Sequence, residues 1–280
     1  MKKIKFILLN FFRKVRMKNS RTKLKIENKK EKGVLYIVFG NKNMMMEAIA
    51  SIHSIRIYNK KIPVQVYTDN PEFFYSRIVD EFLEIIKVDP QHKRSKVDFI
   101  GLSPFVKTLY LDSDTIILFD VDEIFEGLSH FDILFTPDFS RKRVRYSDID
   151  KYNSISSVIP EMNGGVMAFN DSQGVKEFFS SWRNNFYQFF SESNGYDQIS
   201  MRIALAGVRN IKPMVLPGEY NMRPPQVLEK LFQDENENYA SKISPKIVHR
   251  HFNICDDDLN DINAAIHREI SKDLVGIYKL

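Results

Sequence analysis

One stretch constrains the fold of this chain more than any other, the sequence KTLYLDSDTIILF at 107–119. Two apolar runs flank a pair of carboxylates, Asp112 and Asp114, with Ser113 between them. Continuous apolar, β-branched runs are typical of strands buried on both faces. Because an unpaired buried carboxylate is costly, both acids are expected at the carboxyl end of the strand, where a divalent cation can balance them. Their hard oxygens suit Mg²⁺ or Mn²⁺, although a lone Asp-x-Asp can also be a polar strand end that starts a turn.

The residues before this stretch alternate between apolar runs and helical spacing. Strands are predicted at 34–39, 63–67 and 83–88, with helices at 44–58 and 71–82 between them. This order predicts an α/β fold, a single domain with a mixed, mostly parallel sheet flanked by helices. Ligands of such sheets bind at the carboxyl ends of the strands. That edge is expected to carry Phe39, Gly40, Asn41 and Asp69 together with Asp112, Ser113 and Asp114.

A basic segment precedes the Asp-x-Asp strand. Lys93, Arg94 and Lys96 come before an apolar helical face that ends near Pro104. A cation here could reach a diphosphate held at the same edge, and a solvated helix start is the equally open alternative.

Three later motifs contain polar groups that could bind a substrate or a metal ion. Asn163-Gly164-Gly165 allows a positive φ and close approach to a ligand, although such a sequence is also simply a good turn. Asp197-Gln198 begins an apolar helix, where it either caps the helix or presents an acid and an amide to a hydroxylated ligand. His249 and His251 share one face of a late strand, which makes a third metal ligand possible.

Charge is distributed unevenly along the 280 residues. Residues 1–32 contain thirteen Lys or Arg and two Glu, a net charge of +11, so the remaining chain carries −6 of the total +5. An acidic body with a basic tail argues against a nucleic-acid-binding protein. Residues 1–18 have the composition of an amphipathic helix on an anionic membrane surface, and a basic leader or a helix packed on the body is the alternative. The single cysteine, Cys255, excludes an intramolecular disulfide and a cysteine-rich metal site.

These motifs, in this order, resemble the GT-A glycosyltransferases, particularly the family-eight-like nucleotide-diphospho-sugar transferases. The resemblance covers roughly residues 33–252 and rests on SPFVKTLYLDSD, MNGGVM, YDQ and KIVH. It implies a Rossmann-like GT-A domain at 33–255, with a leader and linker at 1–32 and a C-terminal helical extension at 256–280. The implied activity is that of a hexosyltransferase in polysaccharide biosynthesis.

The resemblance also implies ligands and roles for residues. The donor would be a nucleotide-diphosphate sugar, with a UDP-sugar favoured, and the metal would be Mn²⁺ or Mg²⁺. A glycan, a lipid-linked glycan or a protein would accept the sugar, with retention of configuration. Asp112, Asp114 and His249 would bind the metal; Phe39, Gly40, Asn41, Asp69, Lys96, Ser113, Asn163, Gly164 and Gly165 would bind the donor; and Asp197 and Gln198 would lie nearest the reacting sugar.

One departure from the family pattern concerns the late histidine. Family-eight members usually follow it with a glycine and a Lys-Pro-Trp-type segment, whereas Arg250-His251-Phe252 follows here. The diphosphate contacts at that end are therefore open, and His251 could replace His249 as ligand.

Two other functions remain as alternatives. Asp112-Ser-Asp-Thr115 also fits the start of haloacid-dehalogenase-like phosphatases, in which Asp112 would be the nucleophile, but that motif normally closes the first strand. A non-catalytic module that binds a sugar or a partner is the third reading. If the chain is a glycosyltransferase, we expect it in the cytoplasm. It would be peripheral at the inner face of a membrane if residues 1–18 bind that surface.

Overall fold

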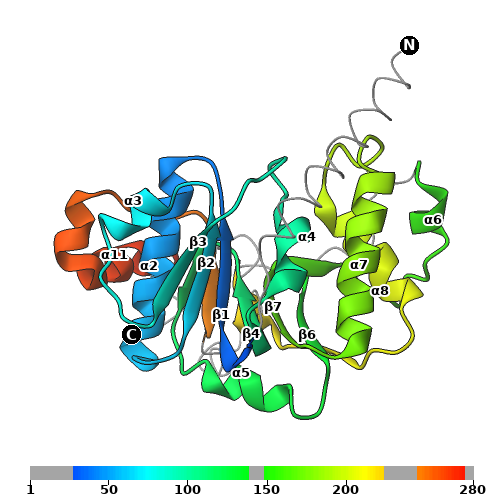
Figure 1. Cartoon of the computed structure of the whole chain (residues 1–280), viewed down its shortest axis with the longest axis horizontal. Helices are drawn as coiled ribbons and strands as arrows, with labels where there is room; N and C mark the ends of the chain where they lie inside the picture. Colours follow the sequence, from blue (N-terminus) through cyan, green and yellow to red (C-terminus); the bar gives the residue numbers. More distant parts are fainter. Residues whose placement is uncertain (1–27, 139–147, 224–244, 275–280) are drawn as a thin grey trace, which may run out of the picture.

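A computed structural model describes residues 28–138, 148–223 and 245–274 of the chain (Figure 1). A seven-stranded sheet in the order β3-β2-β1-β4-β7-β6-β8 forms its centre. Neighbouring strands from β3 to β4 are parallel, β7 is antiparallel to both of its neighbours, and β8 is parallel to β6. The expected mixed, mostly parallel sheet in a single domain is therefore confirmed. The strands are β1 (Lys30–Val38), β2 (Val64–Thr68), β3 (Leu83–Lys87), β4 (Phe105–Leu111), β6 (Ile133–Pro137), β7 (Met162–Asn170) and β8 (Pro213–Val215).

Helices cover both faces of the sheet and bury a separate apolar core on each (Figure 1). Side chains of β1 alternate between the two cores, as the period of a strand requires: Tyr36 belongs to one and Leu35 to the other. One layer contains α2 (Lys42–Tyr58), α3 (Pro71–Tyr75) and α11 (Ile262–Leu274), and the other contains α4 (Lys96–Phe99), α7 (Gln173–Gln188) and α8 (Asp197–Gly207). Shorter helices are α5 (Asp122–Gly127), α6 (Asp150–Asn153) and the 3-10 turns η1 (Ile100–Leu102), η3 (Gly218–Asn221) and η4 (Asp257–Asp261).

The direction of β7 determines which motifs meet at one edge. Because β4 and β7 are antiparallel, the carboxyl end of β4 lies beside the amino end of β7. The backbone N–H of Asp112 donates to the carbonyl oxygen of Gly165 over 2.7 Å. The Asp-x-Asp motif and the Asn-Gly-Gly motif are therefore neighbours, although about fifty residues separate them in sequence.

A second, two-stranded sheet brings the late histidine to the same edge. It pairs β5 (Thr115–Ile117) with β9 (Ile247–His249), and Thr115 is opposite His249. The backbone N–H of Arg250 also donates to the carbonyl oxygen of Asp114 over 2.9 Å. The segment after the acids is thus fixed to the segment that contains His249.

The predicted turn at Asn163-Gly164-Gly165 is wrong. These residues lie in β7, and neither glycine has a positive φ. The pairing of β6 and β7 shifts there, because Phe135 is opposite Met167 whereas Thr136 is opposite Asn163. The residues between form a bulge, which redirects the strand next to the edge that carries the acids.

Some predicted boundaries also differ. The first strand begins at Lys30 instead of residue 34, because Lys30 and Lys32 pair with the start of β4, so part of the predicted linker belongs to the sheet. The helical extension packs on the domain, with Ile266 and Ile270 of α11 buried in the same core as α2. The predicted amphipathic helix at 1–18 lies outside the described residues. Within the described ranges, none of the helices combines the length and apolar character needed to cross a bilayer.

Candidate functional site

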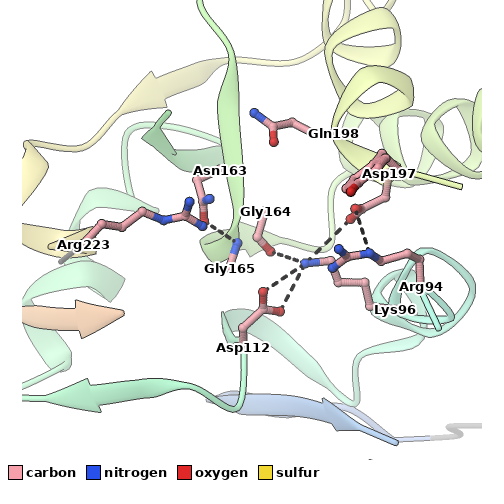
Figure 2. A pocket seen from close by; sticks show the side chains of 10 residues that line it. Arg94, Lys96, Asp112, Asn163, Gly164, Gly165, Asp197, Gln198 and Arg223 are labelled. Atoms are coloured by element: carbon pink, nitrogen blue, oxygen red, sulfur yellow. Dashed lines mark hydrogen bonds and ion pairs between the residues drawn. The ribbon is translucent and has the colours of Figure 1, made fainter. Parts of the chain in front are cut away.

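A cavity of about 190 Å³ opens at the edge where β4, β7 and α8 meet (Figure 2). Seven of the fourteen residues predicted to form the site line it. Its walls are Arg94, Lys96, Asp112, Asn163, Gly164, Gly165, Tyr196, Asp197, Gln198 and Arg223.

Lys96 lies at the centre of the cavity's polar contacts (Figure 2). Its ammonium Nζ is 3.1 Å from both carboxylate oxygens of Asp112, donates to the carbonyl oxygen of Gly164 over 3.0 Å, and is 3.7 Å from Asp197. Burial favours the neutral amine, but the charges of Asp112 and Asp197 outweigh it and raise the pKa of Lys96. The side chain therefore remains a cation that joins β4, β7 and α8.

Tyr110 supplies a further contact to Asp112. Its hydroxyl donates to Asp112 Oδ1 over 2.6 Å from two residues earlier on the same strand. Burial and the nearby charge of Asp112 raise the pKa of Tyr110 well above its ordinary value, so the hydroxyl keeps its proton and remains a donor. Together, Tyr110 and Lys96 hold the Asp112 carboxylate in one orientation.

Three residues at this edge could hold a metal ion. Asp112, Asp114 and His249 each offer one ligand atom, and these atoms lie within 4.8 Å of one another. The set contains two carboxylates and one imidazole, which Mn²⁺ and other divalent cations accept. Burial opposes ionisation of Asp114, but the hydrogen bond and charge of His249, together with the charge of His251, lower its pKa below its ordinary value.

Asn221 fixes the imidazole of His249. Its side-chain oxygen is 2.6 Å from His249 Nδ1, and its amide nitrogen donates to Thr136 Oγ1 over 2.9 Å. Because the Asn221 side-chain oxygen accepts, Nδ1 is the donor in this contact, and Nε2 is directed at Asp114 Oδ1, 3.4 Å away. An outer contact of this kind is what orients a metal-binding histidine.

His249 and His251 face different carboxylate oxygens of Asp114, Oδ1 and Oδ2 respectively. Its Nδ1 is 3.1 Å from buried Glu47 and 3.7 Å from Asp114. Glu47 also accepts from the backbone N–H of Phe252 over 2.9 Å, and burial is the main cause that raises its pKa. Since His251 is held by Glu47, His249 is the histidine that completes the three-residue cluster.

Of the two glycines of β7, only Gly165 is required by close approach. A Cβ atom on Gly165 would lie 2.2 Å from the imidazole of His249, and one on Gly164 would lie 3.4 Å from Lys96 Nζ. Any side chain at Gly165 would therefore displace His249. The need for glycine is steric, which differs from the predicted need for a positive φ.

Asp197 and Gln198 begin α8 at the far wall of the cavity (Figure 2). The Asp197 carboxylate lies 3.7 Å from both Arg94 Nε and Lys96 Nζ. Gln198 donates to Asp138 over 3.1 Å. The N-cap residue is Tyr196, so the capping alternative does not describe the role of Asp197.

Four predicted donor-binding residues lie at the ends of β1 and β2 and do not line the cavity. Phe39 packs against Phe99, with ring centroids 5.8 Å apart, and Gly40 has a φ of +96°. Asn41 caps α2, where its Oδ1 accepts a backbone N–H over 2.9 Å. Asp69 Oδ1 is buried and has no hydrogen-bond partner within the part of the chain that the structure describes. Ser113 is buried between the two acids.

The sequence reasoning missed three residues of the site. Tyr110 was hidden because it reads as part of the apolar strand, although its spacing of two from Asp112 places both side chains on one face. Asn221 and Arg223 lie in an irregular segment, PGEYNMRPP at 217–225, whose composition gives no periodic signal. Only the pairing of β9 with this segment brings them to the site.

Searches with the sequence found no matching family model and no matching curated protein. Solved structures do match. The chain is similar to the galactosyltransferase LgtC in complex with donor and acceptor sugar analogues, with a TM-score of 0.53, 12% identity and coverage of 85% of this chain and 95% of that one. It is also similar to the glycosyltransferase GlyE of Streptococcus pneumoniae TIGR4, with a TM-score of 0.54, 16% identity and coverage of 87% and 64%.

A third similar structure is mouse xyloside xylosyltransferase 1 in its apo form. The TM-score is 0.50 at 10% identity, and the match covers 79% of this chain and 98% of that chain. Identities this low report on fold alone. The chain therefore has the GT-A-like fold of these glycosyltransferases.

Proposed function

We propose that this chain is a metal-dependent glycosyltransferase that moves a sugar from a nucleotide-diphosphate sugar, with UDP favoured as the nucleotide, to a hydroxyl of a glycan, a lipid-linked glycan or a protein. The observation that carries the proposal is the cluster of Asp112, Asp114 and His249 beside a cavity lined by Lys96 and Asp197. Its place at the carboxyl ends of the strands suits a nucleotide ligand. The fold shared with known glycosyltransferases adds support.

Asp112, Asp114 and His249 would hold Mn²⁺ or Mg²⁺. When bound, the cation supplies positive charge that stabilises a departing nucleoside diphosphate. Asn221 holds the His249 imidazole with Nε2 directed at Asp114, and the hydrogen bond from Tyr110 holds Asp112 in one orientation. The ligand set is therefore arranged in advance by groups behind it.

Lys96 and Arg94 add positive charge at the cavity wall. Both face Asp197, and Lys96 also contacts Asp112, so the two carboxylates and two cations surround a small polar space. Fixed cations of this kind stabilise negative charge that grows during a reaction. Asp197 and Gln198 are the polar groups of α8 that would lie against the transferred sugar and the incoming hydroxyl. Retention of configuration is part of this proposal.

A donor screen by thermal shift tests the proposal. UDP-, GDP-, CMP- and TDP-sugars would each be added with Mn²⁺ or with EDTA, because a ligand that binds only the native state raises the melting temperature. We expect one nucleotide to give a metal-dependent shift that Asp114→Ala abolishes. No shift with any nucleotide, together with a shift by vanadate or beryllium fluoride, would favour the phosphatase alternative instead.

The position of Asp112 in the fold argues against the phosphatase alternative. Asp112 follows β4, the fourth strand among the described residues, whereas the phosphatase motif normally closes the first strand. The residues around Asp112 also include Asp114 and His249, which together with it form a possible metal cluster. A glycosyltransferase accounts for the residues better.

A further inference from the structure

Arg223 lines the cavity from the side opposite Arg94 and Lys96 (Figure 2). Those two cations both face carboxylates, since Lys96 Nζ is 3.1 Å from Asp112 and Arg94 Nε is 3.7 Å from Asp197. Arg223 has no carboxylate partner within residues 28–138, 148–223 and 245–274. It is therefore the cavity's cation whose charge the described part of the protein does not balance.

The backbone that leads to Arg223 is fixed to the metal-binding cluster. The N–H of Met222 donates to the carbonyl oxygen of Ile247 over 2.8 Å, and the N–H of His249 donates to the carbonyl oxygen of Met222 over 2.7 Å. The side chain of Asn221 holds the His249 imidazole. Three consecutive residues thus orient the histidine, pair with its strand and supply a guanidinium to the cavity.

The charge and shape of this wall define the ligand chemistry. The cavity contains three cations and two carboxylates, and both carboxylates are already matched by Lys96 and Arg94. A guanidinium presents its N–H donors in a planar fork that matches phosphate and carboxylate oxygens. An unmatched fork directed at a polar cavity suits an anionic group of a ligand.

We propose that Arg223 binds an anionic oxygen group of a substrate, a phosphate or a carboxylate, in this cavity. The inference rests on the proposed function, because it places that group beside the sugar-transfer site. Two sources offer the same chemistry: the diphosphate of the donor, and an acidic substituent on the saccharide that gives or receives the sugar. Arg223 would select substrates that contain such a group and would discriminate against neutral ones.

The test compares Arg223→Gln and Arg223→Lys with the wild type and with Arg209→Gln. Arg209 is exposed on the loop after α8 and outside the cavity, so its loss controls for the removal of one positive charge. Binding of inorganic pyrophosphate with Mn²⁺ would be measured by calorimetry, since this probe does not depend on the nucleotide base. Glucose 6-phosphate and glucuronate, each compared with glucose, probe the saccharide source by the same method.

If the donor diphosphate is the ligand, Arg223→Gln should weaken pyrophosphate binding roughly 10- to 100-fold, Arg223→Lys should restore part of it, and Arg209→Gln should bind as the wild type does. If an acidic saccharide is the ligand, pyrophosphate binding should stay unchanged, and the preference for glucose 6-phosphate or glucuronate over glucose should disappear in Arg223→Gln. Melting temperatures of the variants verify that each is folded.

Two results would overturn the inference. One is equal binding of all anions by Arg223→Gln and Arg209→Gln, and the other is a wild type that binds none of these anions. Failure of the proposed function is recognised separately. In that case no nucleotide sugar would bind in a metal-dependent manner, while anion binding would still depend on Arg223.

Discussion

Two clusters of charged side chains each include a residue of the short helix α4. They differ in whether solvent reaches the central carboxylate. The buried cluster consists of Asp98 with His92, Arg183 and Tyr187. Arg183 Nε is 2.7 Å from Asp98 Oδ1, His92 Nε2 is 3.1 Å from Oδ2, and the Asp98 side chain has no exposed surface. The cavity cluster, Lys96 with Asp112 and Asp197, leaves 23% of the Asp112 side chain exposed.

The difference separates a structural network from a site. Both clusters satisfy their carboxylates with cations, as buried charges require. The buried cluster joins the segment before α4 to α7, and its carboxylate is closed off from solvent. The cavity cluster joins α4, β4 and α8 around open space and lies next to Asp114 and His249. Accessibility, and not the number of ion pairs, therefore indicates function here.

The largest expected effect is on activity and comes from Asp114→Asn. The amide is nearly isosteric but cannot supply the charged ligand, so sugar transfer with Mn²⁺ should fall by more than the roughly 10- to 100-fold that loss of an outer contact causes. Steady-state kinetics with the donor found in the screen measures this. The melting temperature without metal verifies that the variant is folded, and a folded variant that retains full activity would contradict the metal site.

The buried cluster should show the opposite pattern. Asp98→Ala leaves Arg183 and His92 without their carboxylate partner in a buried place and should reduce the free energy of unfolding by about 3–5 kcal/mol. Denaturant unfolding measures this change. Activity per folded molecule should stay near that of the wild type. A soluble, stable variant that has lost activity would mean that Asp98 belongs to the site, and the buried cluster would then not be purely structural.

Lys96→Met tests the cavity cluster, where a loss of activity is expected. The substitution keeps an apolar chain of similar length but removes the charge next to Asp112 and Asp197, so kcat should fall by roughly 10²-fold. Addition of Mn²⁺ should stabilise this variant more than it stabilises the wild type, because Asp112 loses its other cation. Equal stabilisation of the two proteins would show that Lys96 and the metal do not share Asp112.

A smaller effect is expected for Asn221→Ala. Without the acceptor on Nδ1, the His249 imidazole can rotate or change tautomer, so Mn²⁺ affinity should fall roughly 10- to 100-fold. Asn260→Ala, in the exposed 3-10 turn η4, provides a matched control. Calorimetric titration measures the Mn²⁺ affinity of both variants. Identical affinities of Asn221→Ala and Asn260→Ala would mean that Asn221 does not orient His249.

The smallest effect concerns pH and a partly buried histidine outside both clusters. Burial lowers the pKa of His53 on α2 below its unfolded value. The unfolded state therefore binds the proton first, and the contribution of His53 to stability is present above the unfolded pKa, near 6.5, and is lost as pH falls through the lower folded pKa. His53→Gln should flatten the decrease in unfolding free energy below about pH 6.5. Unchanged pH profiles for the two proteins would contradict this.

Much of the site could be predicted because it follows the ends of apolar strands. The run before Asp112 identifies a buried strand, so its carboxyl end had to carry the acids to the edge of the sheet. Lys96 and Asp197 were found as charged residues at the starts of helices. The contacts of Lys96 with Asp112 and Asp197 were not predicted, because side-chain direction depends on how the helices pack.

What could not be predicted depends on contacts between distant segments. An apolar run does not reveal strand direction, and only the antiparallel placement of β7 brings Gly165 against His249. Asn221 meets His249 and Glu47 meets His251 across 28 and 204 residues of sequence, with no periodic pattern at either end. The sequence likewise does not show that Asn221 contacts His249 whereas Glu47 contacts His251.

Electron paramagnetic resonance of Mn²⁺ would test the central claim most directly. The signal of free Mn²⁺ would be recorded as wild type, Asp114→Asn or Asp98→Asn is added, with and without UDP. We predict that wild type and Asp98→Asn bind one ion, more tightly with UDP, and that Asp114→Asn does not. Equal Mn²⁺ binding by Asp114→Asn and the wild type, or no binding by the wild type in the presence of UDP, GDP, CDP or TDP, would contradict a metal-dependent nucleotide-sugar site at Asp112, Asp114 and His249.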